Sequence, residues 1–251
     1  AATFKIDEAN NRVVPPQGIP PVISTFDLNA MEAALQLKSE LGDTKITTIS
    51  FGPATVKDSL KQTLALGADE AVHIMDDSLM GGDAFSTAYV LAQAIRKTGD
   101  FDLILTGRQA SDWDQGLVPI GVAEYLGIPS VNPCRKVEVR DGRAVVERVI
   151  EDGYEVVEVP LPAVVTASNE MNTPRYPTLK GIMAAAKKQL PVWMAADLDI
   201  DAGRVGEAGS RSTMVKLYVP KYDAQCEFIE GDSPAEQAEK LALKLREARL
   251  I

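Results

Sequence analysis

The stretch FDLILTGRQASDWDQGLVPIGVAEYLGIP at residues 101–129 decides the fold. Its apolar run LILT is typical of a strand buried on both faces, and Gly107 ends that run. A polar loop follows over residues 108–116, and Leu117–Leu126 is predicted to form a helix. Strand, loop and helix in this order predict one repeating unit of a parallel α/β sheet.

The loop of this unit is a candidate nucleotide-binding loop. In a parallel sheet it lies at the carboxyl end of its strand, where open α/β sheets bind ligands. The start of the following helix offers unpaired backbone N–H groups and the positive end of the helix dipole, which suit a phosphate. Asp112 and Asp114 repel a phosphate, so we expect them to cap the loop and helix or to bind ribose hydroxyls. Because any α/β loop has this pattern, nucleotide binding and an ordinary connection both stay open at this point.

The composition excludes several classes of function. The chain has 251 residues, of which 45% are hydrophobic and 25% charged, as in ordinary soluble proteins. A net charge of −10 argues against nucleic acid as a partner. No apolar run is long enough to span a bilayer, so no membrane insertion is expected.

The cysteines and the histidine suggest neither a metal site nor a catalytic triad. Cys134 and Cys226 are far apart and form no C-x-x-C motif. The single histidine, His73, is interpreted as a strand residue.

Strand and helix alternate on the amino-terminal side of the central unit, which predicts a mostly parallel twisted sheet with right-handed crossovers. An α/β domain normally opens with a core strand, and none is visible, so the natural chain is expected to start earlier. Residues 3–6 are predicted to form a short edge strand. The further predicted elements are a helix from residue 24 or 27 to 41, a strand at 45–51, a helix at 54–66, a strand at 70–75 and a helix at Ala84–Thr98 that Asp83 caps.

The pattern changes after residue 131. Three segments alternate apolar and polar residues and are separated by Asp-Gly pairs, so they predict an antiparallel β meander. A buried strand, a helix, a strand and a long amphipathic helix follow. These segments are the meander strands at 135–139, 144–150 and 155–159, the buried strand at 162–166, the helix at 179–188, the strand at 214–219, and the helix at 234–250 with Ser233 as its cap.

Two domains are expected from this order. Residues 1–190 are predicted to form an α/β adenine-nucleotide-binding domain. Residues 191–251 are predicted to form a C-terminal helical arm, whose helix packs on a partner subunit.

Several motifs along nearly the whole chain resemble the beta (small) subunit of electron transfer flavoproteins. They are Ser24-Thr25-Phe26-Asp27; Phe51-Gly52-Pro53 with LALGAD at 64–69; Gly107-Arg108-Gln109-Ala110 with Asp112 and Asp114; RVIEDG at 148–153; PAVVTA at 162–167; and NTPRY at 172–176 with Leu179.

The resemblance implies an adenine-nucleotide hydrolase-like α/β fold and an obligate heterodimer with a larger alpha subunit that holds the redox-active FAD. It implies that the beta subunit holds AMP, or a second FAD in electron-bifurcating members. It also implies an electron carrier, with no catalysis of its own, between an acyl-CoA dehydrogenase or related flavoenzyme and an acceptor such as a quinone oxidoreductase. A cytoplasmic location is expected, or the mitochondrial matrix in a eukaryote.

The resemblance also implies the site residues. Backbone N–H groups near residues 115–118 would bind phosphate, and main-chain groups near Phe51 would read the adenine edge. The loop around Met171 matches the family's recognition loop, which anchors the dehydrogenase. The expected cofactor contacts are Ser24, Phe51, Gly52, Asp112, Asp114, Gln115, Gly116, Leu117 and Val118, and the expected partner contacts are Met171, Asn172 and Pro174.

The chain departs from the family pattern at Trp113, which replaces a small or acidic residue. A large indole crowds a bulky flavin, which favours AMP over a second FAD. The alternative function is a universal-stress-type homodimer that binds an adenine nucleotide. The meander, the Met171 loop and the terminal arm have no use in that interpretation, so it ranks second.

Overall fold

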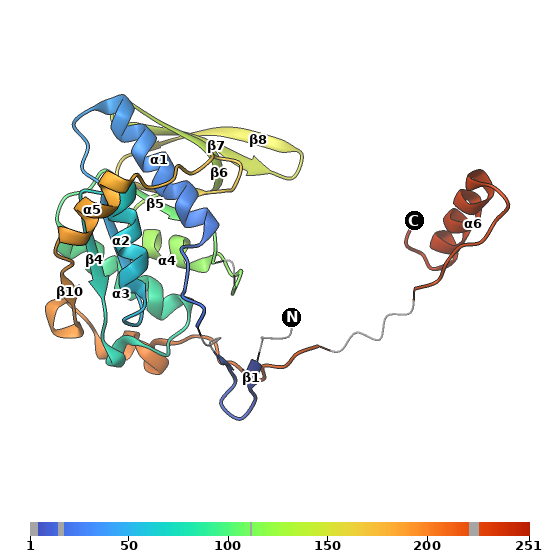
Figure 1. Cartoon of the computed structure of the whole chain (residues 1–251), viewed down its shortest axis with the longest axis horizontal. Coiled ribbons are helices and arrows are strands. Elements are labelled where there is room, and N and C mark those ends of the chain that lie inside the picture. Colours follow the sequence, from blue (N-terminus) through green and yellow to red (C-terminus); the bar gives the residue numbers. More distant parts are fainter. Residues whose placement is uncertain (1–4, 15–17, 111, 221–225) are drawn as a thin grey trace. The chain divides into compact units, whose positions relative to one another are not determined.

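The computed structural model describes residues 5–14, 18–110, 112–220 and 226–251. The chain divides into two units, one within residues 17–213 and the other formed by residues 1–16 and 214–251. The larger unit alternates strands and helices (Figure 1). Its main elements are α1 (Thr25–Leu41), β3 (Thr47–Phe51), α2 (Val56–Leu66), β4 (Glu70–Ile74), α3 (Ala84–Thr98), β5 (Leu103–Gly107), α4 (Leu117–Leu126), β6 (Ser130–Arg140), β7 (Arg143–Ile150), β8 (Gly153–Pro160), β9 (Ala163–Ala167), α5 (Leu179–Lys187) and β10 (Val192–Trp193).

The strands of the larger unit form two sheets. One has the order β10-β4-β3 and is parallel throughout. The other has the order β5-β9-β6-β7-β8, in which the first three strands are parallel and β6 to β8 form the antiparallel meander. The predicted fold class, α/β with parallel strands, an antiparallel meander and a C-terminal helix, is therefore confirmed.

Strand β3 is an end strand of the three-stranded sheet, and β5 is an end strand of the five-stranded sheet. No described strand pairs with the outer edge of β3 or of β5. Both strands are half-buried along most of their length, whereas β9 is buried throughout and β4 nearly so. Helices cover the two strands, since α1 packs on β5 and β9 while α2 and α3 pack on β3. The loops that follow β3 and β5 therefore begin at the ends of strands that have one unpaired edge among the described strands.

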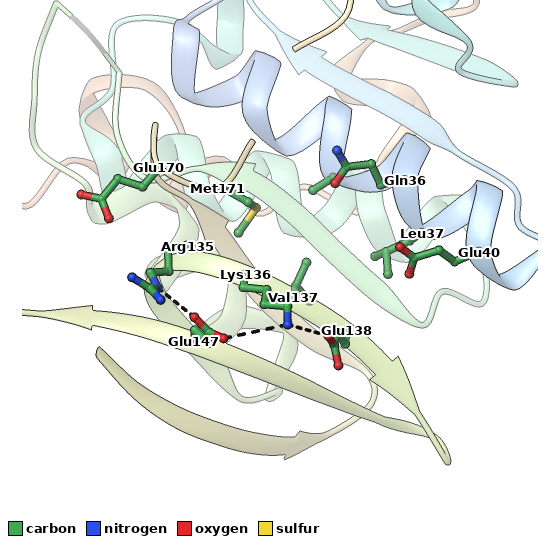
Figure 2. A pocket seen from close by; sticks show the side chains of 11 residues that line it. Gln36, Leu37, Glu40, Arg135, Lys136, Val137, Glu138, Glu147, Glu170 and Met171 are labelled. Carbon is green, nitrogen blue, oxygen red and sulfur yellow. Dashed lines mark hydrogen bonds and ion pairs between the residues drawn. The ribbon is translucent and has the colours of Figure 1, made fainter. Parts of the chain in front are cut away.

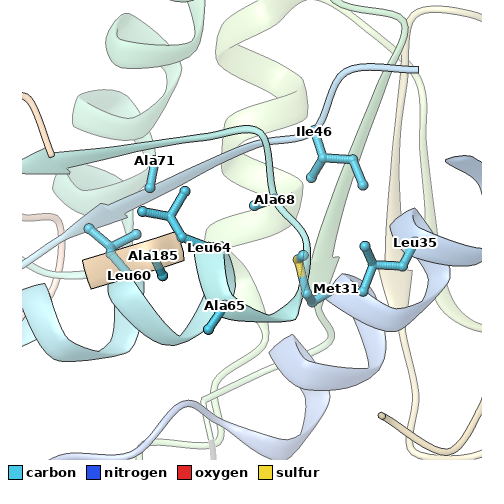
Figure 3. Packing of buried hydrophobic residues seen from close by; sticks show 9 residues of the cluster. All are labelled: Met31, Leu35, Ile46, Leu60, Leu64, Ala65, Ala68, Ala71 and Ala185. Atoms are coloured by element: carbon cyan, nitrogen blue, oxygen red, sulfur yellow. The ribbon is translucent and has the colours of Figure 1, made fainter. Parts of the chain in front are cut away.

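Helix α1 and helix α2 meet over a shared core. Figure 3 shows Met31 and Leu35 of α1 in one cluster with Leu60 and Leu64 of α2, together with Ile46 and four alanines. These four large side chains are all less than a tenth exposed. Each buried leucine stabilises the fold by roughly 2 kcal/mol relative to an exposed one. This core fixes the position of α1, on which much of the candidate site depends.

The meander follows its turn residues closely. Asp141 and Gly142 both have positive φ, 50° and 72°, as a two-residue type I′ turn requires. The second turn is one residue earlier than the Asp-Gly pair indicated, because Gly153 already pairs with Ile150 at the start of β8. The long strands of the meander are therefore confirmed, with a shift in one turn.

The smaller unit holds a hairpin and the terminal helix. Strand β1 (Lys5–Asp7) pairs with β2 (Arg12–Val14), close to the predicted edge strand. Helix α6 (Pro234–Glu247) begins as predicted, with the Ser233 hydroxyl accepting the Glu236 N–H at 3.3 Å.

The predicted strand at residues 214–219 is wrong. This segment forms no helix or strand. The Asn11 side chain accepts the Leu217 N–H at 3.0 Å and donates to the Val215 carbonyl at 3.4 Å. The Asn11 side chain, and no described strand, thus bonds this part of the backbone.

Candidate functional site

The loop between β5 and α4 leaves the start of α4 open to an anion. Gly116 is the N-cap and is left-handed, with φ 65°, and no side chain caps the helix. A Cβ at Gly116 would lie 3.3 Å from the Arg108 carbonyl oxygen. Leu117 and Val118 therefore present first-turn N–H groups without a side-chain cap, and no acidic side chain stands in that turn. These are the requirements of a phosphate site at a helix start.

The polar residues of the loop lie at the surface. Asp112 accepts the backbone N–H of Trp113 at 3.0 Å, and the Asp114 carboxylate accepts a hydrogen bond from the Gln109 amide. Asp114 has φ 55°, so the loop turns sharply there. Asp112, Asp114 and Gln115 are all exposed. The two carboxylates shape the loop and keep oxygen atoms accessible to hydroxyl donors.

The start of α1 is joined to the end of β5. An oxygen of Asp27 accepts the Gly107 N–H at 2.8 Å, and a Cβ at Gly107 would lie 2.8 Å from the Asp27 nitrogen. The Arg108 guanidinium lies 5.5 Å from the centre of the Phe26 ring. Ser24, the N-cap of α1, precedes these residues, and its carbonyl accepts the N–H of Leu28. The structure thus brings the first turn of α1, with Ser24, to the strand end from which the candidate loop departs.

Phe51 and Gly52 stand at the end of β3. The Gly52 N–H donates to Ile74 at 3.1 Å, and His73 donates from Nε2 to the Gly52 carbonyl at 2.9 Å. A Cβ at Gly52 would lie 2.7 Å from a methyl group of Val56. His73 is a buried residue of β4, which agrees with its interpretation as a strand residue. The protein itself therefore engages the main chain of Gly52, which leaves Phe51 as the better candidate for an adenine contact.

The predicted cofactor residues form two groups. Ser24 and residues 112–118 gather around the end of β5, and Phe51 with Gly52 lies at the end of β3. In the part of the chain that the structure describes, no hydrogen bond or ion pair connects the second group with residues 112–118. A ligand that used both groups would have to reach across the division between the two sheets.

The segment containing Met171, Asn172 and Pro174 is held firmly on α1. The Asn172 amide donates to the Asn29 carbonyl at 3.0 Å, and the Asn29 amide donates to the Asn172 carbonyl at 2.7 Å. Met171 is partly buried and packs against the core of the five-stranded sheet. Pro174 is partly buried as well. Met171 is therefore less accessible than an anchor on an open loop would be.

A charged pocket lies beside Met171, between α1 and the meander (Figure 2). Its volume is about 490 Å³. Arg135 pairs with Glu147 at 2.8 Å and Lys136 pairs with Glu138 at 2.7 Å, while Glu40 and Glu170 add two further carboxylates to the lining. The lining of the pocket is therefore net acidic.

Sequence reasoning missed the polar residues that hold this segment in place. Glu32 of α1 is buried and accepts three N–H groups from Arg175, from Nε at 2.7 Å, Nη2 at 2.8 Å and the backbone at 3.1 Å. Asn29, one turn earlier, is buried as well. Hydrogen bonds from Arg175 lower the pKa of Glu32. The available signal was a pair of polar residues three apart on the buried face of α1.

The described residues contain no cluster of three or more His, Cys, Asp or Glu side chains placed to hold a metal ion. Among these residues, no helix is both long and apolar enough to cross a membrane.

Comparison with known proteins gives a consistent result. A family model described as electron transfer flavoprotein domain matches residues 12–198. An electron transfer flavoprotein subunit beta from Thermoanaerobacterium thermosaccharolyticum is 40% identical over 86% of this chain and 83% of its own length. A protein of the same name from Clostridium acetobutylicum is 38% identical over 100% of this chain and 95% of its own. The caffeyl-CoA reductase-Etf complex subunit CarD of Acetobacterium woodii is 35% identical over 98% of this chain and 94% of its own.

Proposed function

Since this chain belongs to the electron transfer flavoprotein family, with beta subunits among its relatives, we propose that it is the beta subunit of a heterodimer that passes electrons between an acyl-CoA dehydrogenase-type flavoenzyme and a downstream acceptor. The acceptor would be a quinone oxidoreductase or a protein of similar role. The observation that carries this proposal is the likeness to beta subunits along nearly the whole chain. The name of the Acetobacterium woodii relative places that protein in a complex with a reductase, which supports a flavoenzyme partner.

The flavin of the alpha subunit would supply the redox chemistry, and this chain would bind a nucleotide and dock without catalysis of its own. The uncapped start of α4 fits a phosphate, and the exposed Asp112 and Asp114 fit ribose hydroxyls. We propose AMP as the nucleotide, because Trp113, half-exposed on the same loop, leaves less room for a second FAD. Ser24 and Phe51, with the backbone of residues 115–118, complete the proposed contacts.

The test is co-expression with an alpha subunit, followed by extraction and chromatography of the bound small molecules. We expect one flavin and one AMP per heterodimer. Replacing Gly116 with valine should remove the AMP and keep the flavin, because the new side chain stands at the phosphate position and strains φ 65°. Gly127→Val is the matched control, since Gly127 has φ 70° at the other end of α4 and open space around it. Equal AMP content in both variants would show that the loop assignment is wrong.

The second candidate is a universal-stress-type homodimer that binds an adenine nucleotide, favoured only by the α/β plan itself. It predicts a colourless dimer of this chain with no flavin partner. The antiparallel meander and α6, which buries none of its own residues, have no role in it.

A further inference from the structure

The single histidine of the chain, His73, is buried near the end of β4 and bonds the turn that follows β3. The residue is 2% exposed, and its Nε2 donates to the Gly52 carbonyl at 2.9 Å. Its neighbours in β4, Val72 and Ile74, are apolar and buried. A polar ring in such surroundings costs free energy unless it is hydrogen-bonded, so the bond to Gly52 is what makes a histidine acceptable at this position.

This bond lies where the ladder between β3 and β4 stops. Phe51 is paired with Ile74, the last residue of β4. The Gly52 N–H donates to the Ile74 carbonyl at 3.1 Å, whereas the Gly52 carbonyl turns to the imidazole of His73. Because a Cβ at Gly52 would lie 2.7 Å from a methyl group of Val56, the turn also requires a glycine. Gly52 is therefore held through both of its backbone groups.

The two bonds of Gly52 determine where the backbone of Phe51 points. The Gly52 N–H and the Phe51 carbonyl belong to one planar trans peptide unit, in which they point in opposite directions. Since the N–H points to β4, the Phe51 carbonyl points toward the edge of β3 that no described strand occupies. The Phe51 N–H points to the same edge, because the backbone groups of successive strand residues alternate between the two edges. The turn thus presents a donor and an acceptor side by side at an open strand end.

A donor beside an acceptor is complementary to the edge of an adenine. Adenine presents its amino group, a donor, next to the ring nitrogen N1, an acceptor, whereas guanine presents a carbonyl acceptor next to an N–H donor. A nucleotide whose phosphate is held at the start of α4 cannot turn its base over, so the order of donor and acceptor distinguishes the two bases. A site that is built to hydrogen-bond one base rejects another whose groups leave it unpaired.

We propose that His73 is a positioning residue of the nucleotide site and a determinant of its preference for adenine. The imidazole acts through Gly52: its bond to the Gly52 carbonyl holds the turn, so that the N–H and carbonyl of Phe51 keep their direction. Without this bond Gly52, whose residue type has the greatest backbone freedom, would be held on one side only. Polar groups that are fixed before the ligand arrives bind it more tightly, because less ordering is needed on binding. This inference rests on the proposed function, in which the chain binds an adenine nucleotide.

The experiment uses the heterodimer. It measures the release of bound AMP by exchange with labelled AMP, and the concentrations of AMP and of GMP that displace the label. His73→Leu removes the donor and should speed AMP release roughly three- to tenfold, the equivalent of one ordinary hydrogen bond. The same variant should lower the preference for AMP over GMP. His73→Gln carries an amide donor and should restore both values toward those of the wild type.

Thr48→Val is the matched control. The Thr48 hydroxyl bonds the Thr63 hydroxyl at 2.8 Å, near the other end of β3. The control therefore removes a side-chain hydrogen bond from the same strand and should leave AMP release and base preference unchanged. His73→Met is a second variant without a donor, for use if His73→Leu does not assemble with the alpha subunit.

The outcomes separate positioning from a purely structural role. If His73→Leu releases AMP no faster than Thr48→Val and keeps the same base preference, the inference is wrong. Equal losses in His73→Leu and His73→Gln would refute it too, because the donor would then not be the cause. If neither apolar variant assembles although Thr48→Val does, His73 serves folding and the positioning role is overturned. A wild-type heterodimer without an adenine nucleotide would overturn the proposed cofactor, and this inference with it.

Discussion

Replacing Arg175 with methionine should loosen the attachment of the Met171 segment to α1, which the Asn29–Asn172 hydrogen bonds would still maintain, and should destabilise the chain. Arg175 donates three N–H groups to Glu32, whose side chain is 6% exposed, while the Arg175 side chain is 45% exposed. Removing one partner of a fully buried ion pair costs about 3–5 kcal/mol. Because water reaches the Arg175 side of this pair, we expect a smaller loss of roughly 1–3 kcal/mol in the free energy of unfolding.

The loss should depend on pH in a defined direction. The hydrogen bonds from Arg175 hold the pKa of Glu32 below the value in the unfolded chain, which is about 4.3. The stabilisation by the pair is therefore fully present above that pH and disappears as the pH falls through the lower, folded pKa. The difference between wild type and Arg175→Met should be largest near neutral pH and should shrink in acid.

The assay is urea unfolding of the wild type, Arg175→Met, Glu32→Gln and the double variant. The double-mutant cycle should give a coupling energy above about 1 kcal/mol. Arg143→Met is the control, because Arg143 and Glu158 form a pair that is exposed on both sides and should contribute less than about 1 kcal/mol. A coupling no larger than the effect of the control would refute the assigned role of the buried carboxylate.

Three further outcomes are expected. Deleting residues 234–251 should weaken the heterodimer on gel filtration and leave the melting temperature of the isolated chain unchanged, because no residue of α6 is buried. An alkylating reagent should modify Cys226, which is exposed, and spare Cys134 in the native chain, because burial raises the pKa of Cys134 to about 12 and keeps it a thiol; mass spectrometry after digestion measures both. Gly181→Val should lower thermal stability by more than about 2 kcal/mol, because the Ala65 carbonyl leaves no room for a side chain, and an unchanged melting curve would contradict the packing of α5.

Short-range signals predicted most of the secondary structure. The bounds of α3 and α4 agree with the expected helices, because Asp83 caps the first and glycines limit the second. The Asp141-Gly142 pair predicted its turn because both residues accept positive φ. The strand expected at residues 214–219 was wrong because β propensity describes a residue's fit to a sheet, and no described strand pairs with that segment.

The candidate site was predictable only in part. The loop after β5 was visible from its order of strand, polar residues and helix. The hydrogen bonds that Gly107 donates to Asp27 and Arg175 donates to Glu32 join residues 80 and 143 positions apart, so no local pattern could pair them. The exposure of Tyr176 and the partial burial of Met171 likewise depend on what packs against each residue.

The sequence alone determined the α/β class, the meander, the helix limits and the resemblance to a family, because each depends on periodicity, turn chemistry or motif order along the chain. Only the tertiary structure decided the division of the parallel strands at β3 and β5, the attachment of the Met171 segment to α1, and the outward apolar face of α5, where Leu179, Ile182 and Met183 are exposed. The physical reason is that burial and pairing are relations between distant segments. The same amphipathic pattern in α5 is compatible with either face turned inward until Gly181 and Ala185 are seen to be the residues that contact α2.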